Sequence, residues 1–450
     1  MKTVLKTKPQ PSALFRWTVL VVISFAMFGN YYIYDSISPL ADVLKQQLGY
    51  SDANIGMLNA IYSFPNIIMV LIGGLIIDRI GTRKSVLIFT VLIMLGALVT
   101  AVKGDIVVMS IGRLIFGLGA ESMIVAITTI IARWFKGKEL SLAFGLNLTV
   151  ARLGSFMALN SPSWGKDLYA YWQSPLWITV AAGGFAMLCI ALYYFIDVYA
   201  SNNYELPKEG NQDKINIKEI FSFGKSFWFI TALCVTFYSA MFPFQTFAVK
   251  FFQEAHGTSR EVGGSLSSML TLAAMIFTPI FGYLSDKFGK RSLLMMFGSL
   301  LIIPVYLMMA YKFGKPDVMM PSDFLNISIG FADLNVALPK YLLLPMGMMG
   351  IAFSLVPAVM WPSVALVVKE SKLGSAYGLM TMIQNIGLFA FNIIIGYSND
   401  ISNATVQNPS GYNLGMWIFS ILGFLGLFFA YLLRRSEKGI GGHGLEEGMK

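Results

Sequence analysis

Long apolar runs alternate with short polar loops along the whole chain. Twelve runs contain about 20 mostly apolar residues, which is the length that a helix needs to cross a bilayer. Six of these runs precede the polar stretch at 201–218 and six follow it, so the pattern predicts an all-α membrane protein with twelve transmembrane helices in two six-helix bundles. The predicted spans are 15–39, 52–77, 85–102, 107–134, 139–160, 174–197, 226–250, 260–285, 292–311, 339–367, 373–398 and 411–433.

A duplicated loop relates the two sets of spans. The pattern G-x-x-x-D-[RK]-x-G-x-[RK] runs from Gly74 to Arg83 and again from Gly282 to Arg291. A second match aligns 143–154 with 376–387 at a larger offset, so an insertion precedes the tenth span. Parallel repeats of this kind are related by an axis along the membrane normal, and they place a substrate site between the halves near the midplane.

The repeat predicts where the parts of the chain begin and end. We expect an N-terminal bundle at 1–200 and a C-terminal bundle at 226–436, joined by a linker at 201–225 that ends in a short amphipathic helix. The insertion at 312–339 is expected to form an ordered extracytoplasmic cap or hairpin, and residues 437–450 are expected to form a cytoplasmic tail.

Composition and charge agree with a membrane protein. Apolar side chains make up 56% of the chain and charged ones only 13%, too few to solvate a globule of 450 residues. The formal net charge of +9 comes from short loops, not from a basic stripe with interleaved aromatics, so no nucleic-acid partner is expected. Lys and Arg concentrate in the loops on the side of both termini, which predicts cytoplasmic N- and C-termini.

Two charges fall deep inside predicted spans. Glu121 lies near the middle of the fourth span and Arg152 past the middle of the fifth. Because a central charge costs roughly 2.5–3.5 kcal/mol to insert, both side chains should face the bundle interior. Either they form a structural ion pair or they receive a substrate. Their counterparts in the second half are the neutral Ser354 and Asn385, which favours the substrate role.

A carboxylate and a guanidinium at similar depth suit a small zwitterion. Glu121 would take an ammonium and Arg152 a carboxylate. The termini of a dipeptide lie about 6 Å apart, which helices packed about 8–10 Å apart can bracket. Asp35 is a third candidate, as a partner for a basic side chain or as an outer gate. The other expected pocket residues are Tyr34, Tyr62, Asn66, Tyr238, Gln245, Ser354, Trp361, Tyr377, Gln384 and Asn385.

The duplicated loops carry charges suited to gating. Their aspartates can close a helix end, while their cations can clasp a neighbouring helix in one state and release it in the other. The alternative is that these cations only set the topology. Arg113, about two turns before Glu121, is expected to bond helix-end carbonyls. The predicted gating residues are Asp78, Arg79, Arg83, Arg113, Asp286, Lys287 and Arg291.

Catalytic signatures are absent from the sequence. It contains no phosphate-binding G-x-x-x-x-G-K-[ST], no G-x-S-x-G and no H-E-x-x-H. Cys189 and Cys234 fall in apolar runs, while His256 and His443 fall outside the predicted spans. We therefore expect no enzyme, no cofactor and no metal site, and any coupled proton would have to use a carboxylate, first of all Glu121.

The two duplicated loops and the segment Arg113–Ala120 resemble motifs of the major facilitator superfamily. The resemblance extends over nearly the whole chain. Within this superfamily, the chain looks like the branch of lysosomal dipeptide transporters, and the segments that carry this likeness are Tyr62–Asn66, Gly119–Ser122, Trp134–Leu140, Ala151–Ser155, Met360–Pro362 and Gln384–Gly387. The resemblance implies transport of dipeptides by facilitated uniport.

Members of that branch act with a glycosylated accessory membrane protein and carry an acidic dileucine sorting signal. Residues 1–14 have no such signal, which favours a bacterial inner membrane, and the insertion at 312–339 is a candidate to replace or exclude the accessory protein.

Two rival functions stay open. One is a proton-coupled exporter or importer of drugs or metabolites, although 154–158 lacks the Gly-Pro signature of antiporters. The other is a non-transporting sensor or scaffold.

Overall fold

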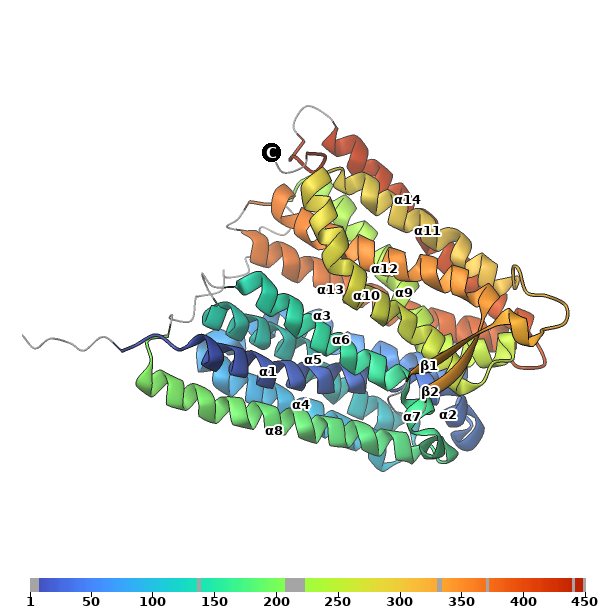
Figure 1. Cartoon of the computed structure of the whole chain (residues 1–450), viewed down its shortest axis with the longest axis horizontal. Helices are drawn as coiled ribbons and strands as arrows, with labels where there is room; N and C mark the ends of the chain where they lie inside the picture. Colours follow the sequence, from blue (N-terminus) through green and yellow to red (C-terminus); the bar gives the residue numbers. More distant parts are fainter. Residues whose placement is uncertain are drawn as a thin grey trace, which may run out of the picture.

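The structure is a bundle of long helices with one β-hairpin at an end of the bundle (Figure 1). This computed structural model describes residues 8–135, 139–206, 223–329, 334–369, 372–438 and 442–447. Across those ranges, 11 helices are long and apolar enough to cross a membrane, or 12 if the broken helix at 52–80 is a single span. The prediction of an all-α membrane fold is therefore confirmed.

The first half contains six long helices and four short elements. The long helices are α1 (Ala13–Asp35), α3 (Asp52–Ile80), α4 (Thr82–Val102), α5 (Ile106–Phe135), α6 (Leu140–Leu159) and α8 (Gln173–Asn203). The short elements are η1 (Ser38–Leu40) and α2 (Ala41–Leu48) after α1, and α7 (Ser161–Trp164) and η2 (Lys166–Ala170) after α6.

The second half contains six long helices and the hairpin. The helices are α9 (Lys225–His256), α10 (Arg260–Phe288), α11 (Arg291–Ala310), α12 (Lys340–Val367), α13 (Leu373–Ile401) and α14 (Asn413–Glu437). The insertion contains η4 (Pro321–Asp323) and the antiparallel strands β1 (Phe324–Ile329) and β2 (Leu334–Pro339), and η6 (Pro409–Tyr412) precedes α14. Most of the expected linker at 201–225, including its amphipathic helix, lies outside the described residues.

Several helices run beyond the ends that hydropathy predicts. The predicted sixth and seventh spans end at 197 and 250, whereas α8 continues to Asn203 and α9 to His256. Hydropathy falls at Asp197 and Lys250, yet both side chains are fully buried. Their ion pairs with other helices replace the solvent that a charge at a span end would otherwise need.

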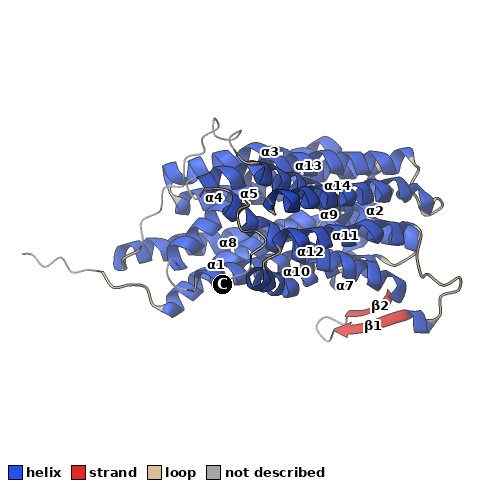
Figure 2. Ribbon diagram, turned by 90° about the horizontal axis from the view of Figure 1, so that it is seen from above, coloured by secondary structure: helices blue, strands red, loops and turns tan. Residues whose placement is uncertain are grey.

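The two ends of the bundle differ. We call the end that carries β1, β2 and α2 the hairpin end, and the opposite end, where the described chain begins and finishes, the terminal end (Figures 1 and 2). The duplicated loops lie at the terminal end. Figure 1 shows the helices of the two halves diverging toward the terminal end and meeting near the hairpin.

A buried charge cluster joins the halves at the hairpin end. The Nζ atom of Lys250 on α9 lies 2.8 Å from Asp52 Oδ1 on α3, and neither side chain is more than 1% exposed. The same Nζ lies 3.1 Å from Glu254 Oε2 and donates to Tyr412 Oη at 2.7 Å. A second cation, the Nζ atom of Lys45, lies 3.3 Å from the same Asp52 Oδ1. Two cations and two anions thus neutralise one another between the halves.

Two further contacts extend this hairpin-end closure. Arg260 of α10 pairs with Asp42 of α2, and its Nη2 lies 2.6 Å from Asp42 Oδ2. Asp400 of α13 accepts hydrogen bonds from the backbone N–H groups of Asp52 and Ala53, each at 2.8 Å. A carboxylate of the second half therefore caps the first turn of α3, where free N–H groups and the helix dipole favour negative charge.

Small residues allow the backbones of the two halves to approach at this end. A Cβ atom on Gly56 of α3 would lie 2.3 Å from the carbonyl oxygen of Asn392 on α13. A Cβ atom on Gly264 of α10 would lie 2.2 Å from the carbonyl oxygen of Leu159 on α6. Any larger side chain at either position would have to push the halves apart.

We predict that Lys250→Met opens the hairpin end. The substitution leaves the buried Asp52 and the partly buried Glu254 without their shared cation. Removing one partner of a buried ion pair costs roughly 3–5 kcal/mol. Electron–electron resonance between spin labels at Lys103→Cys and Lys315→Cys, in a background with Cys189 and Cys234 replaced by serine, should then report longer distances between the halves.

Lys166→Met is the matched control for this prediction. Lys166 also pairs across the halves, with Glu261 Oε1 at 3.3 Å, but its side chain is 77% exposed. Exposed pairs contribute at most about 1 kcal/mol, so the distances should stay as in the parent protein. Unchanged distances in Lys250→Met would contradict the role assigned to the buried cluster.

Candidate functional site

A cavity of about 80 Å³ lies between the halves and is lined by both of them. We call it the central cavity. Its lining residues are Asn30, Tyr31, Tyr34, Asp35, Tyr62, Glu121, Ile124 and Arg152 of the first half, with Phe242, Gln384, Asn385 and Leu388 of the second. Glu121 comes from α5 and Arg152 from α6, so neighbouring elements of the first half present the acid and the base to one space.

Glu121 faces the cavity with one weak partner. Tyr62 Oη donates a hydrogen bond to Glu121 Oε1 at 3.4 Å. Within the described ranges, no Lys, Arg or His forms an ion pair with this carboxylate. In this state Glu121 and Arg152 therefore do not form the structural ion pair that was one of the two interpretations of the sequence.

Arg152 is held by aromatic rings instead of by a carboxylate. Its guanidinium carbon lies 5.5 Å from the ring centroid of Tyr31 on α1 and 5.3 Å from that of Phe353 on α12. Contacts of this kind contribute roughly 0.5–2 kcal/mol and leave the N–H donors in the guanidinium plane free. Among the residues that the structure describes, no ion-pair partner meets Arg152, so its donors are available to a ligand.

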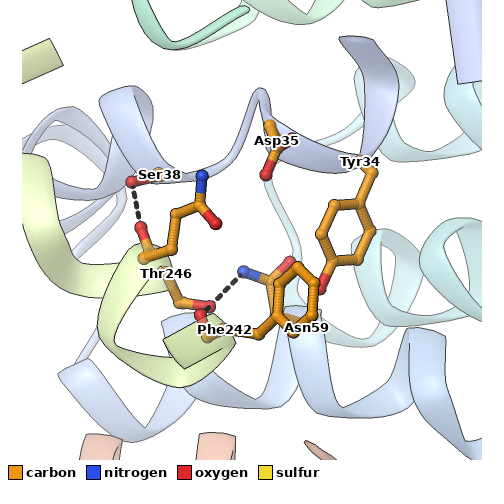
Figure 3. Close-up of a pocket in the computed structure, with 7 residues that line it drawn as sticks. Tyr34, Asp35, Ser38, Asn59, Phe242 and Thr246 are labelled. Carbon is orange, nitrogen blue, oxygen red and sulfur yellow. Dashed lines mark hydrogen bonds between the residues drawn. The ribbon is translucent and has the colours of Figure 1, made fainter. Parts of the chain in front are cut away.

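Asp35 lies between the central cavity and the hairpin-end closure. It also lines a second cavity, of about 10 Å³, which has room for about one water molecule (Figure 3). Hydrogen bonds cross this small cavity from half to half: Ser38 Oγ donates to the Gln245 carbonyl at 2.5 Å, and Asn59 Nδ2 donates to Thr246 Oγ1 at 2.9 Å. The central cavity thus has two carboxylates and one guanidinium in its wall.

The structure brings seven of the predicted pocket residues to the central cavity: Tyr34, Asp35, Tyr62, Glu121, Arg152, Gln384 and Asn385. Gln245 lines the smaller cavity beside it. Asn66, Tyr238, Ser354, Trp361 and Tyr377 line neither of the two cavities.

Most of these remaining residues form a second layer. Tyr238 stacks on the cavity residue Phe242, with ring centroids 5.5 Å apart, and accepts a hydrogen bond from Trp361 Nε1 at 2.9 Å. Tyr377 Oη donates to the carbonyl of Trp361 at 3.1 Å. Ser354 bonds back to the Gly350 carbonyl of its own helix. The polar groups of these four residues are therefore engaged with other parts of the protein.

Sequence reasoning missed five lining residues: Asn30, Tyr31, Ile124, Phe242 and Leu388. Asn30 could have been found, because an amide within an apolar span is costly unless it faces a polar interior. Nothing in the sequence separates Ile124, Phe242 or Leu388 from ordinary packing residues.

The first duplicated loop clasps a helix of its own half. Arg83 Nε lies 2.7 Å from Asp197 Oδ2 on α8, and Arg83 Nη2 donates to Ser201 Oγ at 3.0 Å. Arg133 of α5 lies 3.4 Å from Asp197 Oδ1. Asp78 and Arg79, also predicted to act in gating, have exposed side chains.

The second loop differs from the first. Arg291 Nη2 lies 2.6 Å from Asp286 Oδ1 within the loop, and Lys287 is exposed. The backbone N–H of Arg291 donates to the carbonyl of Leu445, so the tail packs on this loop. The duplicated charges therefore make different contacts in the two halves.

Arg113 is fully enclosed behind the cavity. It donates to the carbonyls of Leu58, Ile33 and Tyr34 at 3.2–3.3 Å, and to Asn59 Oδ1 at 2.7 Å. Two of these carbonyls belong to the last turn of α1, as expected of an arginine that bonds a helix end. Arg113 therefore ties α1 and α3 to α5, and it does not line the central cavity.

Known proteins resemble the chain over almost its entire length. The lysosomal dipeptide transporter MFSD1 of Homo sapiens is 30% identical over 441 residues, which cover 94% of this chain and 87% of that protein. MFSD1 of Danio rerio is 31% identical over 403 residues, which cover 86% and 81% of the two chains.

Solved structures share the fold at lower identity. A bacterial homolog of the human lysosomal transporter Spinster, in its inward-facing and unoccupied conformation, aligns with a TM-score of 0.72 at 16% identity and covers 95% of this chain and 98% of that one. The nucleoside transporter NupG aligns with a TM-score of 0.69 at 14% identity, with 94% and 100% covered.

The family model described as Major Facilitator Superfamily matches residues 23–332 and 244–448, which together span most of the chain. The repeat, the helical fold and the relatives named above agree with this match. The chain belongs to the major facilitator superfamily and is a membrane transporter.

Proposed function

We propose that this protein carries dipeptides across the membrane by alternating access, as a uniporter. The observation that carries the proposal is the unpaired acid and the unpaired base, Glu121 and Arg152, in the wall of one cavity between the halves. A ligand with an ammonium at one end and a carboxylate at the other would neutralise both.

The chemistry of the two side chains assigns the two ends of the ligand. Glu121, with Tyr62 beside it, accepts hydrogen bonds from the peptide ammonium. The planar guanidinium of Arg152, held between Tyr31 and Phe353, donates two parallel hydrogen bonds to the peptide carboxylate. A zwitterion of the wrong length would leave one of these buried charges without a partner, which is costly.

The size of the cavity bears on the state of the transporter. Pockets that bury a whole ligand typically measure about 300–1,000 Å³, whereas the central cavity holds about 80 Å³. The hairpin end is closed by ion pairs between the halves. A dipeptide therefore enters from the terminal end, after the halves have moved further apart there than they are in the state described here.

Orientation and compartment form part of the same proposal. The concentration of Lys and Arg on the side of the termini supports cytoplasmic termini, and therefore an extracytoplasmic hairpin end. The state described here is then closed toward the extracytoplasmic side. A bacterial inner membrane is the proposed location.

The relatives support the same substrate class. MFSD1, which is about 30% identical over nearly the whole chain, bears the name of a dipeptide transporter. A proton-coupled transporter of other metabolites is the second candidate, since Glu121 and Asp35 are carboxylates that line the cavity.

We predict that Glu121→Gln and Arg152→Gln each reduce uptake of radiolabelled alanyl-alanine into proteoliposomes by about 10- to 100-fold. Each variant removes a charge-assisted hydrogen bond worth about 1.5–3 kcal/mol. The exposed surface variant Lys166→Gln should transport at the parent rate. Uptake at the parent rate by either cavity variant would refute the assignment.

Asp35→Asn should change substrate preference more than overall transport. If Asp35 meets a basic side chain, the variant loses about 5- to 50-fold in apparent affinity for alanyl-lysine and little for alanyl-alanine, because only the former carries a second cation. Competition against labelled alanyl-alanine measures both affinities on one preparation. An equal loss for the two dipeptides would instead assign Asp35 to the gate.

A proton gradient separates uniport from the second candidate. Uptake down a dipeptide gradient should proceed at the same rate with the pH equal on both sides of the vesicle and with an imposed pH difference. Accumulation of dipeptide against its own gradient, driven by the pH difference, would establish proton coupling instead.

A further inference from the structure

A groove between α11 and α14 carries three cations at the terminal end of the second half. It measures about 440 Å³ and is lined by Met296 of α11 and by Tyr431, Arg434, Arg435 and Lys438 of α14. Figure 1 shows α11 and α14 side by side along one edge of the molecule, on the side of the C-terminus. We call this space the α11–α14 groove.

The cations continue an apolar stripe on α14. Side chains that recur every three or four residues along one face of this helix are 42–54% exposed, which means that in a membrane they contact acyl chains. The stripe is Leu414, Trp417, Ile421, Phe424, Phe428 and Tyr431. The next positions on the same face are Arg434, Arg435 and Lys438. The face thus changes from apolar to cationic where the helix leaves the hydrocarbon region.

The adjoining face of α11 is also apolar and exposed. Phe297 and Leu300, which lie one and four residues after the groove residue Met296, are each 50% exposed. An acyl chain that lies along α11 and α14 would cover these side chains. Its headgroup would then reach the three cations.

Among the residues that the structure describes, no carboxylate neutralises the three cations. None lines the groove, and in the described parts of the chain Arg434, Arg435 and Lys438 form no ion pair. Arg434 Nε is buried without a hydrogen-bond acceptor. Glu437, in the same turn, is turned away: its carboxylate accepts from Ser226 Oγ at 2.5 Å and from the backbone N–H of His443 at 2.7 Å.

We propose that the α11–α14 groove binds the phosphate of an anionic glycerophospholipid, with its acyl chains along the exposed faces of the two helices. Guanidinium groups bind phosphate oxygens in bidentate geometry, and basic pockets between transmembrane helices suit acidic headgroups. Tyr431 lies at the boundary between stripe and cations, where aromatic side chains favour the interface. A free phosphate would gain the charge contacts without the apolar ones.

The test uses the purified full-length protein in detergent, with no peptide present. Phosphatidylglycerol or phosphatidylcholine is titrated in, and native mass spectrometry counts the lipids retained. The parent protein should retain phosphatidylglycerol in preference to phosphatidylcholine. The triple variant Arg434→Gln, Arg435→Gln, Lys438→Gln should lose roughly fivefold in phosphatidylglycerol affinity for each cation removed.

A triple variant at the hairpin end is the matched control. Lys312→Gln, Lys315→Gln, Lys340→Gln removes the same number of cations from the other end of the same half and should keep the preference. If the groove variant proves too unstable to purify, the single variant Arg435→Gln replaces it, because this side chain is exposed. It should lose roughly fivefold in phosphatidylglycerol affinity.

Three results would overturn the proposal. The groove variant could retain phosphatidylglycerol as the parent does, which would mean that these cations serve only topology. The control could lose as much as the groove variant, which would mean non-specific attraction. Millimolar inorganic phosphate could displace the lipid, which would assign the groove to a soluble anion. None of these results bears on dipeptide transport, because no substrate is present.

Discussion

A charge held away from water needs a counter-charge or hydrogen-bond partners within the protein, and the structure depends on how each buried charge meets this constraint. The hairpin end meets it inside the protein, because Lys250, Asp52, Glu254 and Lys45 neutralise one another between the halves. The central cavity does not meet it, because Glu121 and Arg152 face the same space without forming an ion pair with any described residue. The paired charges at the hairpin end therefore close the transporter, whereas the charges in the central cavity are left for its substrate.

The closed end also explains how the halves can part again. Its ion pairs are desolvated, so their contribution depends on all partners being present and on water being excluded. Opening the hairpin end would admit water to each of these charges, which lowers the cost of separating them. A cluster of this kind favours two distinct states over a continuum between them. The close backbone contact at Gly56 adds to this, since it exists only when the halves touch.

The sequence predicted the parts of this account that depend on one helix at a time. Hydropathy and the duplicated loop were enough for the membrane fold, and the cost of a buried charge was enough to single out Glu121, Arg152 and Asp35. The sequence did not predict contacts between helices that are far apart along the chain. Lys250 and Asp52 lie at span ends, where a charge is ordinarily solvated, and only the packed halves bring them together. Likewise, no local pattern distinguishes Phe242, in the cavity wall, from Tyr238 behind it.

The central claim is that Glu121 binds one end of a dipeptide and Arg152 the other, and blocked peptides test it most directly. Binding of alanyl-alanine, its N-acetyl derivative and its C-terminal amide should be measured for the parent protein, Glu121→Gln and Arg152→Gln. We predict that acetylation weakens binding to the parent and to Arg152→Gln but hardly to Glu121→Gln. Amidation should weaken binding to the parent and to Glu121→Gln but hardly to Arg152→Gln. If each modification weakens binding to all three proteins by the same factor, the two side chains do not bind the two termini and the account is wrong.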